Sequence, residues 1–250
     1  MRRQFSFPVL RLLPLLLWVF MTLSGCGGDD GASVESGSTP GAGNQFLRIF
    51  VRPFAGQYTN TWSFDHDLPL GTFSESDSAL GSRDVLTWRG STRVMFWGDG
   101  RFHDGYDWAL PEGTPLKAVA DGEVFFAGLE EPFTCGSKGA VAALIVGIRH
   151  AVAESTIYES LYVHMSRVDV AVGESVSAGQ LIGLSGNTGC SFGPHLHLTV
   201  RKVTQSGDKV VVDPFGWEGG GDDPWEIYNG GVRSYWLWKE GEAPQGEYVE

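Results

Sequence analysis

Apolar and polar residues alternate in short runs along most of the chain, and glycine-rich breaks separate the runs. Alternating or continuous apolar runs occupy residues 46–51, 122–128, 142–148, 156–163, 168–176 and 180–186, and the run at 168–176 is expected to enter a tight turn. A two-residue period is typical of half-buried strands, and a short continuous apolar run is typical of a fully buried strand. Beyond the N-terminus no segment shows a long 3.6-residue apolar period, and 35 glycines favour turns over helices. The pattern therefore predicts a mainly β protein.

The first 25 residues have the pattern of a secretory signal peptide. Arg2 and Arg3 precede an apolar stretch at residues 12–23, and small residues follow it up to Cys26. The Leu-Ser-Gly-Cys sequence that ends there resembles the bacterial lipobox, in which the cysteine is lipid-modified and becomes the new N-terminus. We therefore expect lipid on Cys26 to anchor the protein to a membrane. A plain signal peptide with an incidental cysteine is the alternative.

The next segment, residues 26–45, has the composition of a linker. Apart from Cys26, it consists mainly of glycine, serine and aspartate and contains almost nothing apolar. Such a segment cannot bury enough surface to fold by itself. We expect residues 27–45 to be a flexible tether between the lipid and the folded part of the chain.

Charge and cysteine content narrow the functional classes. The chain carries 30 acidic and 18 basic side chains, which argues against a nucleic-acid binder that neutralises phosphates. No 20-residue apolar span follows the N-terminal segment, which argues against a polytopic membrane protein. Once Cys26 is assigned, Cys135 and Cys190 remain. In an oxidising compartment we expect these two to form a disulfide, with two free thiols as the alternative.

Four of the six histidines lie in sequence contexts that indicate chemistry. His103 and Asp107 form a His-x-x-x-Asp unit, and His195 and His197 form a His-x-His unit. Successive residues of a strand point to opposite faces, so His195 and His197 are expected to share a polar face. His164 is expected to oppose its apolar strand neighbours in the same way. Strands on two sides of a groove would bring these side chains together for metal binding, acid–base catalysis or both.

The residue types favour zinc. Two histidines and an aspartate, with water in the fourth position, suit catalytic Zn²⁺. The mixture of nitrogen and oxygen argues against Ca²⁺, although other divalent transition metals also fit. Of the two remaining histidines, His150 is expected to be structural or exposed. His66 lies between two aspartates, and we expect it to be solvated or hydrogen-bonded, with a second metal site as the alternative.

The same residues carry a family resemblance. Over residues 95–203 the chain resembles the lysostaphin-type (LytM-like) zinc metallopeptidases, which cleave peptidoglycan cross-links. The matching segments are 102–109, 111–118, 121–124, 162–165, 172–176, 179–183, 185–189 and 193–197. The chain departs from the family pattern at Cys190 and Phe192 in the loop before His195. It also has Leu198 where the family usually has an aromatic residue.

The resemblance implies a fold and a set of roles. The fold would be a mainly antiparallel β-sheet metallopeptidase domain with a groove that holds one Zn²⁺ per chain. His103, Asp107 and His197 would bind the metal. His164 and His195 would be the unliganded catalytic pair, one as general base and the other as a donor to the oxyanion, and which does which stays open.

The flanking segments complete the predicted organisation. Residues 46–94 are expected to be a β-rich N-terminal extension. Residues 204–250 are expected to be a loop-rich C-terminal extension packed on the domain. Whether either of them covers the groove stays open.

The predicted function is a lipid-anchored zinc endopeptidase of the bacterial cell envelope, facing the periplasm or the exterior. It would hydrolyse peptide bonds in peptidoglycan stems or cross-bridges. One alternative is a protein that binds and activates other wall hydrolases without catalysis. Another is a metallopeptidase for other peptides, because similar pockets can hold different substrates. The sequence leaves the cleaved bond, the inner or outer membrane and the oligomeric state open.

Overall fold

The computed structural model describes residues 47–67, 82–96, 103–153 and 156–244. The chain separates into two compact units, Met1–Ala42 and Gly43–Glu250, and every described residue belongs to the second. The expected signal peptide, Cys26 and the tether at 27–45 lie outside the described residues. Within the described part of the chain, no helix has the length and apolarity needed to cross a bilayer.

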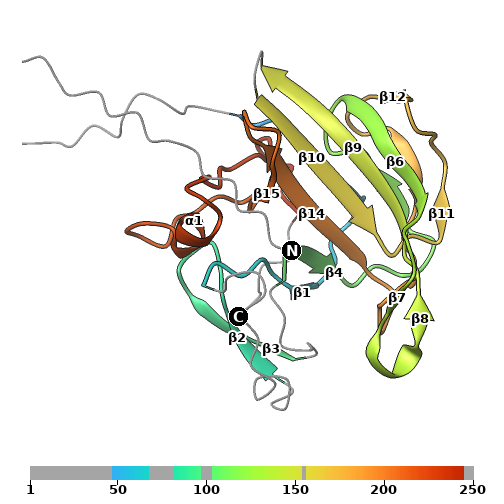
Figure 1. Cartoon of the computed structure of the whole chain (residues 1–250), viewed down its shortest axis with the longest axis horizontal. Coiled ribbons are helices and arrows are strands. Elements are labelled where there is room, and N and C mark those ends of the chain that lie inside the picture. Colours follow the sequence, from blue (N-terminus) through green and yellow to red (C-terminus); the bar gives the residue numbers. More distant parts are fainter. Residues whose placement is uncertain (1–46, 68–81, 97–102, 154–155, 245–250) are drawn as a thin grey trace, which may run out of the picture. The chain divides into compact units, whose positions relative to one another are not determined.

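One antiparallel sheet dominates the fold (Figure 1). Its strands are β1 (Asn60–Trp62), β4 (Gly105–Trp108), β6 (Gly122–Leu129), β9 (Leu144–Ala153), β10 (Thr156–Val163), β12 (Ser175–Val176), β14 (Leu196–Val203) and β15 (Lys209–Val211). They lie in the order β1-β4-β14-β10-β9-β6-β12, and β15 also pairs with β14. Strands β4 and β15 pair with successive stretches of β14, since β4 is opposite 196–199 and β15 is opposite 201–203.

Three smaller sheets complete the strand content. They are formed by β5 (Pro115–Lys117), β11 (Arg167–Val168) and β13 (Leu181–Leu184); by β2 (Ser82–Leu86) and β3 (Thr92–Phe96); and by β7 (Phe133–Thr134) and β8 (Ala140–Val141). The described part of the chain has one short α-helix, α1 (Pro224–Tyr228), and a 3-10 turn at Gly136–Lys138. The mainly antiparallel β fold is therefore confirmed.

Alternation along β14 shows why these residues form a two-faced sheet. Leu196, Leu198 and Val200 are fully buried and join one hydrophobic core. His197 and Thr199 point to the other face, because successive strand residues alternate. That second face of β14 carries the polar groups described below.

Two expected strands differ from the structure. The stretch 168–176, expected to be a strand that enters a tight turn, contains the turn, but its two ends belong to different strands, because β11 pairs with β13 whereas β12 pairs with β6. A turn at Gly173, with a φ of 86°, separates them. Residues 47–51 form no strand. Phe50 instead makes an isolated bridge to Trp238, which lies near the other end of the chain.

The C-terminal segment shares the core of the main sheet. Phe215, Trp225 and Trp238 are buried in the same cluster as the core residues of β14. The Trp238 ring packs edge-on against Phe50 at a centroid distance of 5.6 Å, and Trp225 donates from Nε1 to the Val211 carbonyl. The segment after residue 204 thus contributes large aromatic side chains to one continuous core.

His66 and His150 are both buried and hydrogen-bonded. His66 contacts Asp223 through Nδ1 at 2.7 Å and Asp213 through Nε2 at 2.9 Å. Burial alone would lower the pKa of His66, but the two aspartates outweigh it and raise the pKa to about 9. His150 contacts the Asp121 carbonyl and the Ser160 hydroxyl. Of the expectations for these two residues, the hydrogen-bonded His66 and the structural His150 are the ones observed.

Candidate metal centre and active site

Strand register brings Asp107 and His197 together. Asp107 on β4 is directly opposite His197 on β14, and His103 lies two residues before β4. The close approach of the two strands depends on Gly105, since a Cβ at this position would lie 2.3 Å from the Leu198 carbonyl oxygen. A glycine inside the His-x-x-x-Asp unit therefore lets the unit reach β14.

Three donor atoms converge on one point. His197 Nδ1 lies 2.8 Å from Asp107 Oδ1 and 3.2 Å from His103 Nε2, and His103 Nε2 lies 3.2 Å from Asp107 Oδ1. In a tetrahedral zinc site with bonds of about 2.0–2.1 Å, ligand atoms are about 3.3 Å apart. The three atoms thus already have nearly the spacing that Zn²⁺ requires. Among the described residues, they form the one group of three or more His, Cys, Asp or Glu ligands with this convergence.

Neighbouring polar groups hold the two imidazoles in the orientation that a metal needs. His103 Nδ1–H donates to the Ser63 carbonyl at 3.0 Å, which leaves Nε2 free. His197 Nε2–H lies 2.8 Å from Thr199 Oγ1 and 3.1 Å from Asp104 Oδ1, which leaves Nδ1 free. Such partners fix the tautomer and the ring orientation of metal-binding histidines.

The sequence motifs alone do not identify these supporting residues. Asp104 and Thr199 were visible beside the two motifs, since each is one or two residues from a proposed ligand. Ser63 and Trp62 had no such signal. The Trp62 ring stacks on His103 with a centroid distance of 5.2 Å, although 41 residues separate them in the chain (103 − 62).

The electrostatics of the centre favour a cation. Burial alone would raise the pKa of Asp107, but His103 and His197 hold it well below its usual range. Burial alone would lower the pKa of His197, but Asp104 and Asp107 outweigh it and raise the pKa to about 10. Asp104 and Asp107 together thus stabilise positive charge at the point where the three donor atoms converge.

His195 lies beside this centre. It makes an isolated antiparallel bridge to Gly186 immediately before β14. Its Nδ1–H donates to the Gly193 carbonyl at 2.8 Å, and its Nε2 lies 3.6 Å from Asp107 Oδ2. The hydrogen bond at Nδ1 leaves a lone pair on Nε2, which faces the proposed ligands.

His164 reaches the site differently from the sequence expectation. Strand β10 ends at Val163, and His164 has a φ of 64°, the one positive φ among the described non-glycine residues. Its Nδ1–H donates to the Thr188 carbonyl at 2.7 Å, and its ring centroid lies 4.6 Å from that of His195. A turn, not strand alternation, therefore directs this side chain. Burial, with the neighbouring His197 and His195, lowers the pKa of His164 to about 3.

A disulfide connects two loops near the two proposed catalytic histidines. A disulfide joins Cys135, in the loop between β7 and β8, to Cys190, in the loop before His195. Lys138 also donates to the Ser191 carbonyl. Ser191 Oγ in turn lies 3.1 Å from His195 Nδ1. The β7–β8 hairpin thus braces the loop that carries His195.

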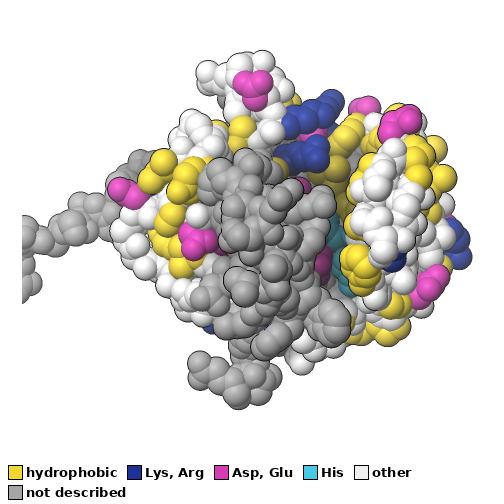
Figure 2. Space-filling view, turned by 60° about the horizontal axis from the view of Figure 1, so that its bottom comes forward, with side chains coloured by type: hydrophobic (Ala, Val, Ile, Leu, Met, Phe, Trp, Pro, Cys, Tyr) yellow, Lys and Arg dark blue, Asp and Glu magenta, His cyan; other side chains and the backbone are white. Residues whose placement is uncertain are grey.

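The site lies in a hollow of the surface. Figure 2 shows histidine side chains at the bottom of the hollow, next to acidic side chains, with lysine and arginine side chains gathered at one end. The side chains of His103, His195 and His197 are 13–16% exposed. The imidazoles are therefore partly exposed in this hollow.

Several known proteins resemble this chain. DD-carboxypeptidase/endopeptidase Mpg of Neisseria meningitidis is 42% identical over 112 residues, which are 45% of this chain and 23% of the relative. Lysostaphin of Staphylococcus simulans is 34% identical over 116 residues, or 46% of this chain and 21% of the relative. Peptidoglycan DD-endopeptidase ShyA of Vibrio cholerae is 41% identical over 95 residues, or 38% and 19%. The chain spans less than a quarter of the length of these curated relatives.

A solved structure and a family model also match parts of this chain. The catalytic domain of lysostaphin from Staphylococcus simulans matches 63% of this chain and 90% of its own chain, with 26% sequence identity and a TM-score of 0.41. The model of Peptidase family M23 matches residues 101–214. This span contains all five of the residues His103, Asp107, His164, His195 and His197. Residues 101–214 of this chain are therefore similar to the domain of Peptidase family M23.

Proposed function

We propose that this protein is a zinc-dependent endopeptidase that hydrolyses peptide bonds in peptidoglycan stems or cross-bridges. The observation that carries the proposal is the convergence of His103 Nε2, Asp107 Oδ1 and His197 Nδ1 within 3.2 Å of one another. Two further histidines face the same point. Relatives that are named peptidoglycan DD-endopeptidase and DD-carboxypeptidase/endopeptidase support the substrate class.

The three converging atoms would hold one Zn²⁺ per chain. A zinc ion bound there would act as a Lewis acid: it would lower the pKa of a bound water molecule toward neutrality and polarise the peptide carbonyl. Asp104, Thr199 and the Ser63 carbonyl keep the two imidazoles turned toward the ion. The donor set and its spacing fit the metal that the family implies.

We assign the general base to His195. Its Nδ1–H is committed to the Gly193 carbonyl, so Nε2 accepts the proton of the attacking water. The Asp107 carboxylate, 3.6 Å from Nε2, stabilises the imidazolium that forms. The same Nε2–H then protonates the amine that leaves. Each proton that His195 takes from water is thus returned to the product.

His164 has the second role. Its Nδ1–H is committed to the Thr188 carbonyl, and its buried ring favours the neutral form. A neutral ring with this tautomer accepts a hydrogen bond at Nε2 and donates none from that atom. His164 Nε2 therefore accepts a hydrogen bond from an N–H group of the substrate and orients it. In this assignment His164 does not donate a hydrogen bond to the oxyanion.

The envelope location belongs to the same proposal. Residues 1–25 direct secretion, lipid on Cys26 anchors the protein to a membrane, and residues 27–45 tether the folded part. A flexible coil of these 19 residues spans about 25 Å, which lets the domain reach nearby wall. We retain 46–94 and 204–250 as extensions that flank a catalytic domain at 95–203. Relatives whose names refer to peptidoglycan support this location.

Mass spectrometry of purified peptidoglycan tests the function. The full chain, purified in detergent, is incubated with the wall polymer, with zinc and after removal of zinc by a chelator. We expect new peptide termini only with zinc and none with His197→Ala, whose fold is checked by circular dichroism. A folded, zinc-loaded wild-type protein that produces no new termini would contradict the endopeptidase and favour a binding protein that activates other hydrolases.

A further inference from the structure

A row of charged residues crosses the main sheet on the face of the metal centre. Arg149 on β9 is directly opposite Glu159 on β10, and Glu159 is directly opposite Arg201 on β14. Residues that are directly opposite on neighbouring strands point to the same face. His197 precedes Arg201 by four residues on β14, so alternation places both on one face. The charged row and the proposed zinc ligands therefore line the same surface.

Glu159 organises the cations of this row. Its side chain is fully buried, and Oε1 accepts from Arg149 Nε at 3.2 Å and from Nη2 at 2.7 Å. Lys209 Nζ lies 3.4 Å from Oε2. Both basic side chains nevertheless stay 46% and 43% exposed. One buried carboxylate thus holds two cations at the surface and neutralises only one of the two charges.

Arg201 adds a third cation to this row. Among the described residues its side chain makes no hydrogen bond and no ion pair. Its charge contributes to the lowered pKa of Asp104, which is the hydrogen-bond partner of His197. We call Arg149, Arg201 and Lys209 the cationic cluster. The exposed Glu123, opposite Arg149 on β6, makes no ion pair with it, and positive charge remains in excess.

An aromatic side chain lies beside the cationic cluster. Phe125 lies at an irregularity in the pairing of β6 with β9, and a Cβ on Gly147 would come within 2.6 Å of its ring. Phe125 therefore covers the backbone of β9. The Arg149 guanidinium and Lys209 Nζ lie 5.5 and 5.1 Å from the ring centroid. Both cations are oriented by the ring as well as by Glu159.

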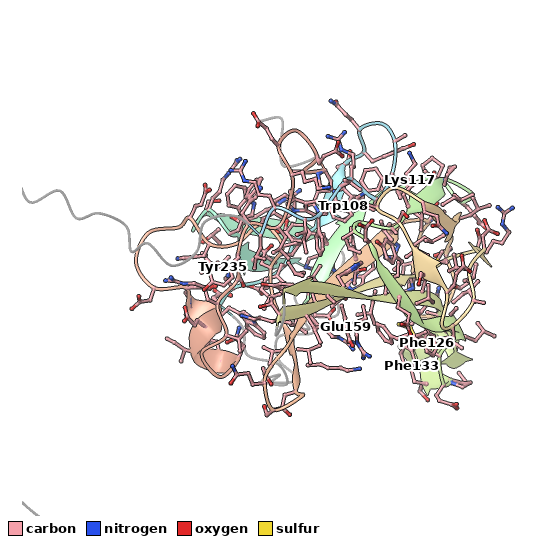
Figure 3. The ribbon with its side chains drawn as sticks, turned by 90° about the horizontal axis from the view of Figure 1, so that it is seen from above. Trp108, Lys117, Phe126, Phe133, Glu159 and Tyr235 are labelled. Carbon is pink, nitrogen blue, oxygen red and sulfur yellow. A yellow bond between two sulfur atoms is a disulfide. The ribbon has the colours of Figure 1, made fainter. Side chains whose placement is uncertain are left out.

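Glu159, which binds two members of the cluster, lies on one face of the main sheet. In Figure 3 Glu159 and Phe126 lie on one side of the main sheet, and Trp108 and Lys117 lie on the other. Figure 2 shows basic side chains at one end of the hollow that contains the histidines. In a chain with a formal net charge of −12, this concentration of positive charge at one end of the hollow is a local exception.

We propose that the cationic cluster is a subsite that binds a carboxylate of the peptide substrate, two to four residues from the bond that is cleaved. The inference rests on the proposed function and adds the part of the substrate that the groove recognises. Four residues of a strand span about 13 Å, and the Arg201 side chain reaches several ångströms in any direction. An extended peptide has about the same rise per residue as a strand. The distance from the metal centre to the cluster therefore corresponds to two to four residues of a bound peptide. Arginine suits this role because its guanidinium can bind a carboxylate with two hydrogen bonds.

The sheet supplies a matched control for the test. Lys202 follows Arg201 on β14 and points to the opposite face, where its Nζ lies 5.7 Å from the Tyr235 ring centroid. Arg201→Gln and Lys202→Gln therefore remove the same charge from the same strand on opposite faces. Neither side chain belongs to the proposed metal centre or catalytic pair.

Binding and cleavage are measured separately on the full chain. Calorimetry at low ionic strength uses an uncross-linked stem peptide with its carboxylates either free or amidated. We expect Arg201→Gln to weaken binding of the free acid about tenfold and to leave binding of the amide unchanged. Lys202→Gln should change neither. With the cross-linked peptide, Arg201→Gln should raise KM for the free acid and leave kcat nearly unchanged.

The outcomes separate this inference from the proposed function. Equal losses for the free acid and the amide, or equal effects of the two variants, would overturn the subsite. If the wild-type protein cleaves the cross-linked peptide but binds the free acid and the amide equally well, the subsite is overturned and the proposed endopeptidase function stands. Binding that depends on the carboxylate and on Arg201, in a protein that cleaves nothing, would support the subsite and contradict the proposed function.

Discussion

Two histidines in this molecule each lie between two aspartates, but their surroundings differ. His197 contacts Asp104 and Asp107, and His66 contacts Asp213 and Asp223. In both pairs the carboxylates outweigh burial and raise the histidine pKa, to about 10 and about 9. Residue types and charge alone therefore do not distinguish the two clusters.

Convergence and access distinguish them. The two nitrogens of His66 face separate carboxylates on opposite sides of the ring, and the cluster is completely buried. At the other site, His197 Nδ1 shares one point with His103 Nε2 and Asp107 Oδ1, and one side is open to the hollow. A histidine between carboxylates can bind a metal where donor atoms of other residues converge with its own. Where they do not converge, as at His66, the histidine stabilises the fold as a buried hydrogen-bonded brace.

Removal of one converging ligand should have the largest effect. We expect His197→Ala to lose stoichiometric zinc and to lower kcat/KM by more than about a thousandfold, because two ligands cannot hold the ion in its catalytic geometry. Elemental analysis and cleavage kinetics measure the two quantities. Retention of zinc and activity by this variant would show that the centre lies elsewhere.

Removal of the buried brace should affect stability without affecting metal content. His66→Gln leaves Asp213 and Asp223 buried without their cationic partner, and we expect a loss of about 3–5 kcal/mol in the free energy of unfolding. Denaturant titration measures the loss. Zinc content should stay at one ion per chain, and a variant that lost zinc without losing stability would reverse the comparison.

The pH dependence of stability should identify the same brace. The pKa of His66 in the folded protein, about 9, lies above its ordinary value of 6.5. Its contribution is therefore fully present below about pH 6.5 and is lost as the pH rises through about 9. Relative to His66→Gln, the wild-type protein should lose about 3 kcal/mol between these values, as measured by denaturant titrations at fixed pH. Parallel curves for the two proteins would contradict a protonated His66.

A smaller effect is expected for a residue that supports the metal centre from behind. Asp104→Asn keeps the shape of the side chain but removes the charge that faces His197 Nε2. We expect zinc affinity to fall about 10- to 100-fold, while stability changes little. Competition with a chromophoric chelator measures the affinity. Asp208→Asn, a charge change at the exposed turn before β15, serves as the control and should leave zinc affinity unchanged.

The alternation of apolar and polar residues correctly predicted the strands whose whole length pairs within one sheet. Strand β10 has the predicted bounds of 156–163, because its alternation is uninterrupted and both of its neighbours pair with it. The shared face of the two ligand-bearing strands follows from the same period. The pattern at 168–176 indicated the turn that the structure has at Gly173, but it did not indicate that the two ends of the stretch join different sheets.

The sequence predicted only part of the site, because some of its residues are positioned by a turn or by partners far away in the chain. The His-x-x-x-Asp and His-x-His spacings are local, so the sequence indicated the candidate residues, and the family resemblance implied which three of them bind the metal. The direction of His164 depends on a left-handed turn that strand alternation does not indicate. The partners of His66 are 147 and 157 residues away in the chain, and nothing in its neighbourhood marked them.

By itself, the sequence determined the β class, the candidate donor atoms and the family resemblance, because these depend on residue type and short-range spacing. Only the tertiary structure decided which histidines converge, which one is a buried brace, and which cations share the face of the metal centre. These outcomes depend on strand register. Register couples residues that are far apart in the chain, and a shift by one residue would turn each side chain to the other face.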